Sequence, residues 1–366
     1  MVSGSRENPH PQQHGKINRH EPRVLFRLTY RSKSLAIAYM NRRRAIRQTF
    51  GFSAAYFISK GYLAAAESTA VADASKGTLH YMMIGDWGWK DDLRPQTAVA
   101  NGMKRYLADQ PFKHEALFML GDNFYGSFKG GTDCPRWKIQ FEDMYPKEVF
   151  PGPCHAMLGN HDYDDEPFDK LAAELAYAKA HPGTRWSLPS KWYRLDLGPA
   201  DKPLVTVLTL DSNYHNSKVS LTKEERQAQM IWFKAELEKP RTAPWLVVMG
   251  HHPLYTNGSH GDTKPLIEQW GSLLQEHKVH AYLCGHDHDL QHLELEGRFT
   301  SFVLSGGGGA KTRALKVTHK VPFGKPAFGF THLQIQADTL TFTHHGVDGA
   351  VLHRFSKKQD GSVVLG

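Results

Sequence analysis

One pattern constrains this 366-residue chain more than any other: five times, a short apolar run ends at a glycine that precedes a side chain able to bind a metal ion. Apolar runs of this length, bounded by glycine, are typical of buried strands. Glycine permits the tight backbone that a loop after such a strand needs. One Gly-Asp turn is commonplace, but five turns that carry carboxylate, amide and imidazole groups are not explained by turn chemistry alone. They are Gly85-Asp86, Gly121-Asp122, Gly159-Asn160, Gly250-His251 and Gly285-His286.

These glycine-ligand turns are expected to meet in one place. In an open α/β sheet, the loops at the carboxyl ends of the strands line a common crevice in which ligands bind. Tyr125 follows Asp122 by three residues, and the last turn adds His288. The predicted pocket therefore holds carboxylate and amide oxygens, three imidazoles and a phenol. Such a donor set predicts a metal site for two ions.

Strand and helix patterns alternate through most of the chain and give way to strands alone near its end. Thr222 and Glu225 form a capping box at the start of the clearest helix. Helices are expected at 96–109, 141–149, 168–181, 222–239 and 265–277, and strands at 78–84, 116–120, 192–197, 204–210, 302–304, 332–335, 340–343 and 351–355. We therefore predict an α/β fold in which two mixed β-sheets pack as a sandwich, with helices on both outer faces.

The net charge of +8 does not indicate a nucleic-acid partner, because it is confined to the N-terminal part of the chain. Residues 1–74 hold 12 Lys and Arg residues against 4 Asp and Glu residues, and the remaining residues hold 33 of each kind. The predicted globular part is therefore neutral overall.

The N-terminal part has the features of an export signal. Residues 1–39 are polar and aperiodic, and we expect them to be disordered or a mis-assigned upstream extension. Within 40–74, the basic segment Arg42-Arg43-Arg44-Ala45-Ile46-Arg47 precedes an apolar run over 50–59 and then Ala72-Asp73-Ala74, the order of a signal peptide with its cleavage site. The paired arginines resemble the twin-arginine type, so we predict export to the periplasm or the extracellular space. The alternative is a basic extension with a chance apolar stretch.

That apolar run is far too short to span a bilayer, and no other segment is expected to form a stable membrane span.

The three cysteines make no disulfide framework. Cys284 lies in an apolar run and is expected to be a small buried hydrophobe. Cys134 and Cys154 flank the same segment, and the sequence leaves open whether they pair in an oxidising compartment.

Taken in order, the five turns resemble the motifs of the calcineurin-like metallophosphoesterases. The segments that carry the resemblance are Gly85-Asp86-Trp87-Gly88, Gly121-Asp122-Asn123-Phe124-Tyr125, Gly159-Asn160-His161-Asp162, Gly250-His251-His252-Pro253 and Gly285-His286-Asp287-His288. The position of Tyr125 narrows it to the purple acid phosphatases, in particular the small tartrate-resistant type. The similarity runs from about residue 79 to 355. It implies one metallophosphoesterase domain over 75–366 with a four-layer αββα architecture.

The resemblance implies a dinuclear centre in which Asp122 bridges both ions. One ion is expected to be Fe(III), because a phenolate and carboxylates are hard anionic donors, and the other is expected to be divalent Fe, Zn or Mn. The other ligands it implies are Asp86, Tyr125 and His288 for the first ion, and Asn160, His251 and His286 for the second.

The resemblance also implies an acid phosphatase that hydrolyses phosphate monoesters by attack of a metal-bound hydroxide. His161 is the first candidate for protonating the leaving oxygen, and His260, nine residues after His251, occupies the position of a second substrate-facing histidine. Small phosphomonoesters and, in addition, phosphoproteins are the expected substrates. The alternatives are a phosphodiesterase or nucleotide hydrolase of the same superfamily, or a non-catalytic metal- or phosphate-binding protein, which would normally lack a ligand.

Overall fold

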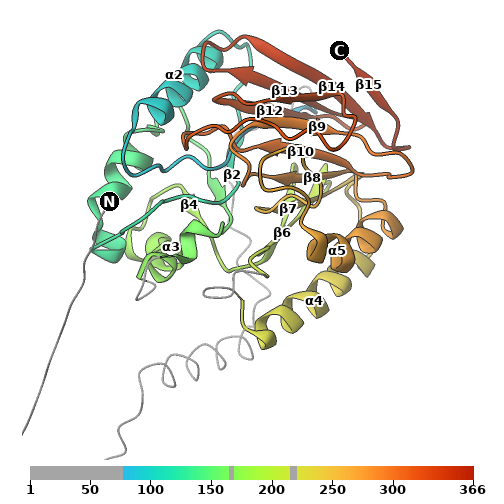
Figure 1. The fold of residues 1–366 in the computed structure, drawn as a ribbon, viewed down its shortest axis with the longest axis horizontal. Coiled ribbons are helices and arrows are strands. Elements are labelled where there is room, and N and C mark those ends of the chain that lie inside the picture. The colour runs from blue at the N-terminus through green and yellow to red at the C-terminus, as the bar shows by residue number, and fades with distance from the viewer. Residues whose placement is uncertain (1–76, 165–168, 215–220) are drawn as a thin grey trace, which may run out of the picture. The chain divides into compact units, whose positions relative to one another are not determined.

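The computed structural model describes residues 77–164, 169–214 and 221–366 (Figure 1). The predicted N-terminal extension (1–39) and export signal (40–74) lie outside these residues. All the described residues belong to one compact unit, Ala66–Gly366. Within them, no helix is both long enough and apolar enough to cross a bilayer.

The first sheet has eight strands, of which four neighbours, β1 to β4, run parallel and the rest pair antiparallel. Its order is β15 (Val363–Leu365), β14 (Val351–Lys358), β13 (Thr339–Gly346), β12 (Gly329–Ile335), β1 (Leu79–Ile84), β2 (Ala116–Met119), β3 (Cys154–Ala156) and β4 (Trp186–Ser187). β1 to β4 therefore form a parallel half and β12 to β15 an antiparallel half, each in sequence order.

The second sheet has seven strands, of which β6, β7, β8 and β10 run parallel to their neighbours. Antiparallel pairing adds β5 at one edge and β9 and β11 at the other. The order is β11 (Phe323–Lys325), β9 (Leu290–Leu293), β10 (Ser301–Ser305), β8 (Ala281–Cys284), β7 (Trp245–Gly250), β6 (Val205–Leu210) and β5 (Tyr193–Leu197). Both sheets are therefore mixed, as predicted.

Alternation of side chains along the strands assigns each face of the two sheets. On β1, Tyr81 and Met83 belong to the same buried apolar cluster as Val247 and Met249 of β7, so this cluster lies between the sheets. Met82, next in sequence, instead packs with a cluster that includes residues of the outer helices. This period of two is what a strand buried on both faces requires.

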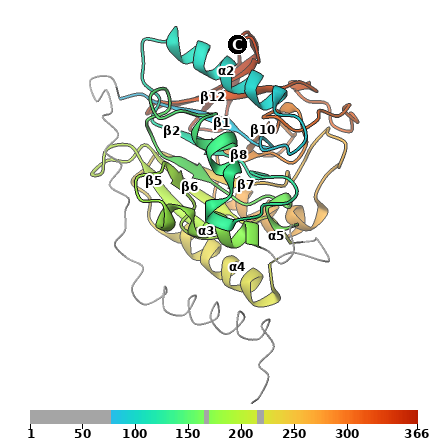
Figure 2. The same cartoon turned by 90° about the vertical axis from the view of Figure 1, so that its left-hand side faces the viewer.

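Helices cover the outer face of each sheet (Figures 1 and 2). On the first sheet lie α2 (Arg94–Ala108) and α3 (Asp169–Ala180), and on the second lie α4 (Lys223–Glu238) and α5 (Lys264–Glu276). The predicted capping box is present: the Thr222 side chain accepts from Glu225 N, and the Glu225 side chain accepts from Thr222 N. The predicted sandwich with helices on both outer faces is confirmed.

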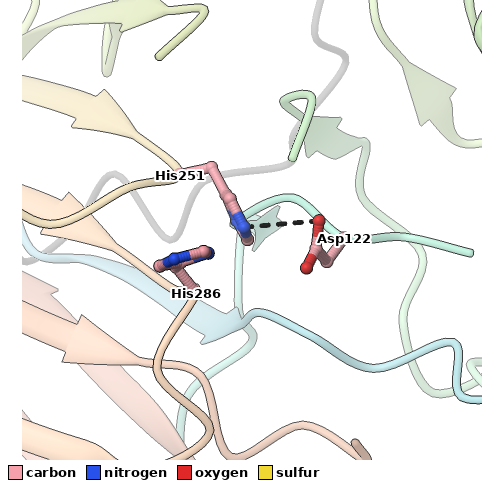
Figure 3. Close-up of side chains that lie close together, drawn as sticks. All are labelled: Asp122, His251 and His286. Carbon is pink, nitrogen blue, oxygen red and sulfur yellow. Dashed lines mark ion pairs between the residues drawn. The ribbon is translucent and has the colours of Figure 1, made fainter. Parts of the chain in front are cut away.

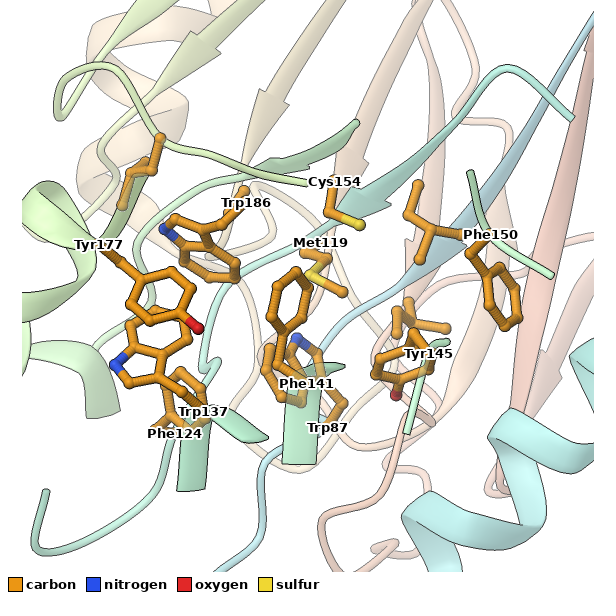
Figure 4. Close-up of a cluster of buried hydrophobic side chains, with 14 of the residues drawn as sticks. Trp87, Met119, Phe124, Trp137, Phe141, Tyr145, Phe150, Cys154, Tyr177 and Trp186 are labelled. Carbon is orange, nitrogen blue, oxygen red and sulfur yellow. The ribbon is translucent and has the colours of Figure 1, made fainter. Parts of the chain in front are cut away.

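The predicted helix over 141–149 is wrong. The helical segment here is a π-helix, Trp137–Glu142, and the chain continues in turns as far as Phe150. Pro146 disfavours helical geometry at Tyr145, so a regular helix cannot run through 141–149. The apolar spacing that suggested a helix instead serves an aromatic cluster, in which Tyr145 and Phe150 pack with their rings 5.8 Å apart (Figure 4). All three cysteines are buried free thiols.

Several buried histidines make the fold sensitive to acid, and His155 on β3 is the clearest case. Burial lowers the pKa of His155 to about 4, and its Nδ1 finds no hydrogen-bond partner among the described residues. The unfolded chain takes up the proton near pH 6.5, so the stability that this neutral imidazole contributes is complete above that pH and is lost as the pH falls towards 4.

We predict that His155→Leu weakens the acid dependence of stability by at most about 3 kcal/mol between pH 7 and pH 4.5, because one titrating site is removed. Urea unfolding of the wild type and the variant at both pH values, with equal metal loading, measures this difference. An identical loss of unfolding free energy in the two proteins would contradict the assignment.

Candidate metal centre

The five predicted turns lie together at one edge of the sandwich. Three of them follow the parallel strands β1, β2 and β3 of the first sheet, and two follow β7 and β8 of the second. Backbone hydrogen bonds join them: Asp86 N donates to Gly121 O at 3.0 Å, and Gly285 N donates to His251 O at 3.0 Å. The two sheets are also linked directly, because His286 N donates to Asp86 Oδ2 at 2.9 Å.

A first donor group contains Asp86, Asp122 and His288, whose ligand atoms all lie within 4.8 Å of one another. Tyr125 completes it, because its hydroxyl lies 3.1 Å from Asp86 Oδ1 and 3.1 Å from His288 Nε2. All four side chains are buried. The structure thus brings together the four residues that were expected around the first ion.

A second donor group contains Asp122, His251 and His286, again within 4.8 Å of one another (Figure 3). His251 Nε2 lies 3.3 Å from Asp122 Oδ1. The remaining expected ligand, Asn160, has a buried Oδ1 with no hydrogen-bond partner in the described part of the chain. The Asn160 loop lies against Asp122, since a methyl group on Gly159 would overlap Asp122 Oδ1. Asp122 therefore belongs to both groups.

Two of the histidines are oriented by hydrogen bonds from the ring nitrogen that faces away from the donor groups. His251 Nδ1 donates to Leu120 O at 2.8 Å, and His288 Nδ1 donates to Lys311 O at 2.7 Å. A proton on Nδ1 leaves the lone pair of Nε2 free to bind a metal ion, as is usual for metal-ligating histidines. His251 Nε2 is buried and makes no hydrogen bond to any described residue.

The backbone is strained at three of the expected ligands. Among the described non-glycine residues, positive φ occurs at Asp86 (57°), Asp122 (50°), His286 (72°) and Lys278 (49°). The left-handed region costs free energy for residues with a side chain, and such strain is concentrated at functional sites. The three ligands occupy the same position in their turns, directly after the glycine.

The electrostatics of the two groups fit bound cations. Burial raises the pKa of Asp86, and the neighbouring Asp122 carboxylate raises it further. Burial also raises the pKa of the Tyr125 phenol, with contributions from both carboxylates. Burial lowers the pKa of His288 to about 4, so this imidazole is neutral and able to act as a ligand. A cation between these groups would relieve the repulsion among the acidic donors.

His161 lies on the short helix after β3, beside the donor groups. Its backbone N–H donates to Asp122 Oδ1 at 2.8 Å, and its ring lies 4.4 Å from that of Tyr125. Nδ1 of His161 forms a short hydrogen bond with Asp164, whose other oxygen accepts from the buried Lys170 ammonium at 2.9 Å. Burial would lower the pKa of His161, but this hydrogen bond and the charges of Asp122 and Asp164 raise it above its ordinary value.

His260 lies in the loop after β7, beside a ligand of the second group. Its Nδ1 lies 2.8 Å from Asp287 Oδ1, and its backbone N–H donates to the same oxygen at 3.2 Å. Its ring centroid is 4.2 Å from that of His286. The structure therefore places both expected catalytic histidines next to the donor groups.

Sequence reasoning assigned no role to two acidic residues within the motifs. Asp162 Oδ1 accepts from Asn123 N at 2.8 Å, and its Oδ2 accepts from Gly159 N at 2.8 Å, so it ties the loops after β2 and β3 together. Asp287 ties the loop after β8 to the loop after β7, because it accepts hydrogen bonds from Thr256 Oγ1 at 2.7 Å and from His260 N at 3.2 Å. Their positions beside ligands were visible in the sequence, but their hydrogen bonds depend on how the loops meet.

Comparison with known proteins agrees with this geometry. A model of the calcineurin-like phosphoesterase family matches residues 79–290. Human tartrate-resistant acid phosphatase type 5 is 30% identical, with 78% of this chain and 92% of the human protein covered. Purple acid phosphatase 7 of Arabidopsis thaliana is also 30% identical, with 78% and 88% covered.

A solved structure shares the fold: GAP50, the anchor in the inner membrane complex of Plasmodium, has a TM-score of 0.67 at 22% identity and covers 76% of this chain and 88% of its own. The family match extends over more than half of the chain and includes all five glycine-ligand turns. The chain therefore belongs to the calcineurin-like phosphoesterase family and, within it, is related to the purple acid phosphatases.

Proposed function

We propose that this protein is an acid phosphatase that hydrolyses phosphate monoesters at a dinuclear metal centre. The observation that carries the proposal is that Asp122 belongs to two donor groups at once, each with its ligand atoms within 4.8 Å. Sharing one carboxylate between two ions is the arrangement that a two-metal hydrolase needs. The similarity to acid phosphatases over most of the chain supports it.

We further propose Fe(III) for the first donor group and divalent Fe, Zn or Mn for the second. A phenol and two carboxylates favour a hard, highly charged ion in the first group, whereas two imidazoles and an amide in the second suit a divalent ion. Bound ions would supply Lewis-acid polarisation of the phosphoryl oxygens and activation of water.

The chain itself provides a proton donor for the leaving alcohol. Against the effect of burial, the hydrogen bond to Asp164 raises the pKa of His161 and favours the imidazolium form that a proton donor needs. Asp164 fixes the ring through Nδ1, and Lys170 holds Asp164 in place with an ammonium that also donates to Phe124 O at 2.8 Å. His161 Nε2 is left to carry the proton that the departing oxygen requires.

We also propose that the protein is exported before it acts. The support is the order of basic segment, apolar run and small-residue cleavage site within residues 40–74. Sequencing the N-terminus of the exported protein tests this, because cleavage predicts a start near Ser75.

Phosphoproteins are proposed as substrates alongside small phosphomonoesters.

We predict that Asp122→Asn lowers kcat for an aryl phosphate monoester by at least about a hundredfold, because it removes charge from the donor shared by both groups. Metal content per chain, measured by mass spectrometry, should fall below two. The exposed Asp91→Asn is the matched control and should keep both activity and metal. Full activity and two metals in Asp122→Asn would contradict the shared role.

We predict that His161→Ala keeps both metals and lowers kcat by about two orders of magnitude, because the leaving oxygen loses its proton donor. The loss should be larger for an alkyl phosphate than for 4-nitrophenyl phosphate, since a basic alcohol needs protonation more. Asp164→Asn should also lower kcat more for the alkyl phosphate than for 4-nitrophenyl phosphate, but both losses should be smaller than in His161→Ala. Equal losses on both substrates would argue against proton donation by His161.

We predict that Tyr125→Phe abolishes a visible absorption band of the metal-loaded protein, because a phenolate bound to Fe(III) is the expected source of colour in this family. Absorption spectra and iron analysis of the two proteins check it. A band that survives with iron retained would exclude Tyr125 as the ligand.

Comparing hydrolysis of an aryl monoester with that of a bis-aryl diester separates a phosphatase from a phosphodiesterase, and failure on both indicates a non-catalytic protein.

A further inference from the structure

A segment at the rim of the metal centre is held at both ends. This rim segment, residues 311–319, follows β10 and lies beside the loop after β7. Near its end, Lys316 N donates to Asn257 O at 2.7 Å. At its start, Lys311 O accepts the Nδ1 hydrogen of His288 at 2.7 Å. Side chains between these two points therefore project from a fixed backbone next to the centre.

Arg313 lies between the two anchors and contacts a histidine of the centre. Its Nη1 lies 3.3 Å from His260 Nε2. Because His260 Nδ1 donates to Asp287, Nε2 carries the lone pair that accepts a guanidinium hydrogen. The same imidazole packs on His286, with 4.2 Å between ring centroids. Asp287 and His260 thus hold the guanidinium beside a proposed ligand of the second ion.

Arg313 lies close enough to Asp289 for its charge to lower the pKa of that carboxyl, but the two side chains form no ion pair. No carboxylate of the described residues forms an ion pair with it, whereas Arg185 pairs with Glu142 at 2.9 Å and Arg194 pairs with Asp196 at 2.8 Å. A guanidinium is well suited to phosphate because its planar fork matches two oxygens.

We propose that Arg313 binds a non-bridging oxygen of the substrate phosphate and makes the enzyme prefer phosphate monoesters to diesters. This inference rests on the proposed phosphatase function. A monoester above its second pKa, near 6, carries about one more negative charge than a diester, so a fixed cation stabilises it more. His260 then acts as a positioning residue for the guanidinium.

The test compares Arg313→Ala, Arg313→Gln and Arg313→Lys with the wild type at pH 7.5. KM and kcat are measured for phenyl phosphate and for bis-phenyl phosphate, and the Kd of orthophosphate is measured by calorimetry on the same metal-loaded proteins. Lys316→Ala is the matched control, because its ammonium holds the same loops together by donating to Ser259 O at 2.9 Å. Metal content is measured for every variant.

Arg313→Ala and Arg313→Gln should raise the monoester KM and the orthophosphate Kd about tenfold or more, with a smaller change in kcat and little change in diester kcat/KM. Arg313→Lys should restore part of the affinity, and Lys316→Ala should stay near the wild type. An unchanged orthophosphate Kd in Arg313→Ala, or an equal loss in Lys316→Ala, would overturn the proposal. If the wild type hydrolyses neither ester, the phosphatase function fails, and the orthophosphate Kd values still decide the role of Arg313.

Discussion

The structure depends on placing several acidic and basic side chains in one buried space. Asp86, Asp122 and Tyr125 are all shielded from water, and each carboxylate raises the pKa of the phenol beside it. Burying ionisable groups without compensation costs several kcal/mol per group, so such a cluster persists only where opposite charge or hydrogen bonds offset the cost. Backbone N–H groups provide part of that compensation, since His161 N donates to Asp122 Oδ1 at 2.8 Å and His286 N donates to Asp86 Oδ2 at 2.9 Å. The donor set is arranged for cations.

Parallel strands explain how the chain brings these donor side chains into one place. The carboxyl ends of β1, β2 and β3 are neighbours in one sheet, and those of β7 and β8 are neighbours in the other. Each end delivers a ligand in a left-handed or tightly packed turn, and Asp162 and Asp287 fasten the turns to one another. The geometry of the centre is therefore set by rigid elements and by a layer of hydrogen bonds around the ligands.

The sequence was sufficient to predict the features that rest on the repeated strand-glycine-ligand turns. A buried strand, a glycine and a ligand leave a local signature, so the sandwich and the residues that meet at its edge could be anticipated. The helix over 141–149 could not be separated from turns, because aromatic spacing satisfies both and Pro146 decides between them. Arg313 carries no motif, and its contact with His260 spans 53 residues of chain, so only the folded loops reveal it.

Each donor group contains side chains from loops of both sheets, so bound ions would also affect the stability of the folded chain. Two ions held there would join the halves of the sandwich as a cross-link does, a task that the three buried free thiols do not perform. Ligands that bind only the folded chain add to its stability in proportion to the logarithm of their concentration over their dissociation constant. A chelator would therefore weaken the union of the two sheets as well as stop turnover, and the lifetime of the enzyme in a metal-poor medium would be set by how slowly the ions leave.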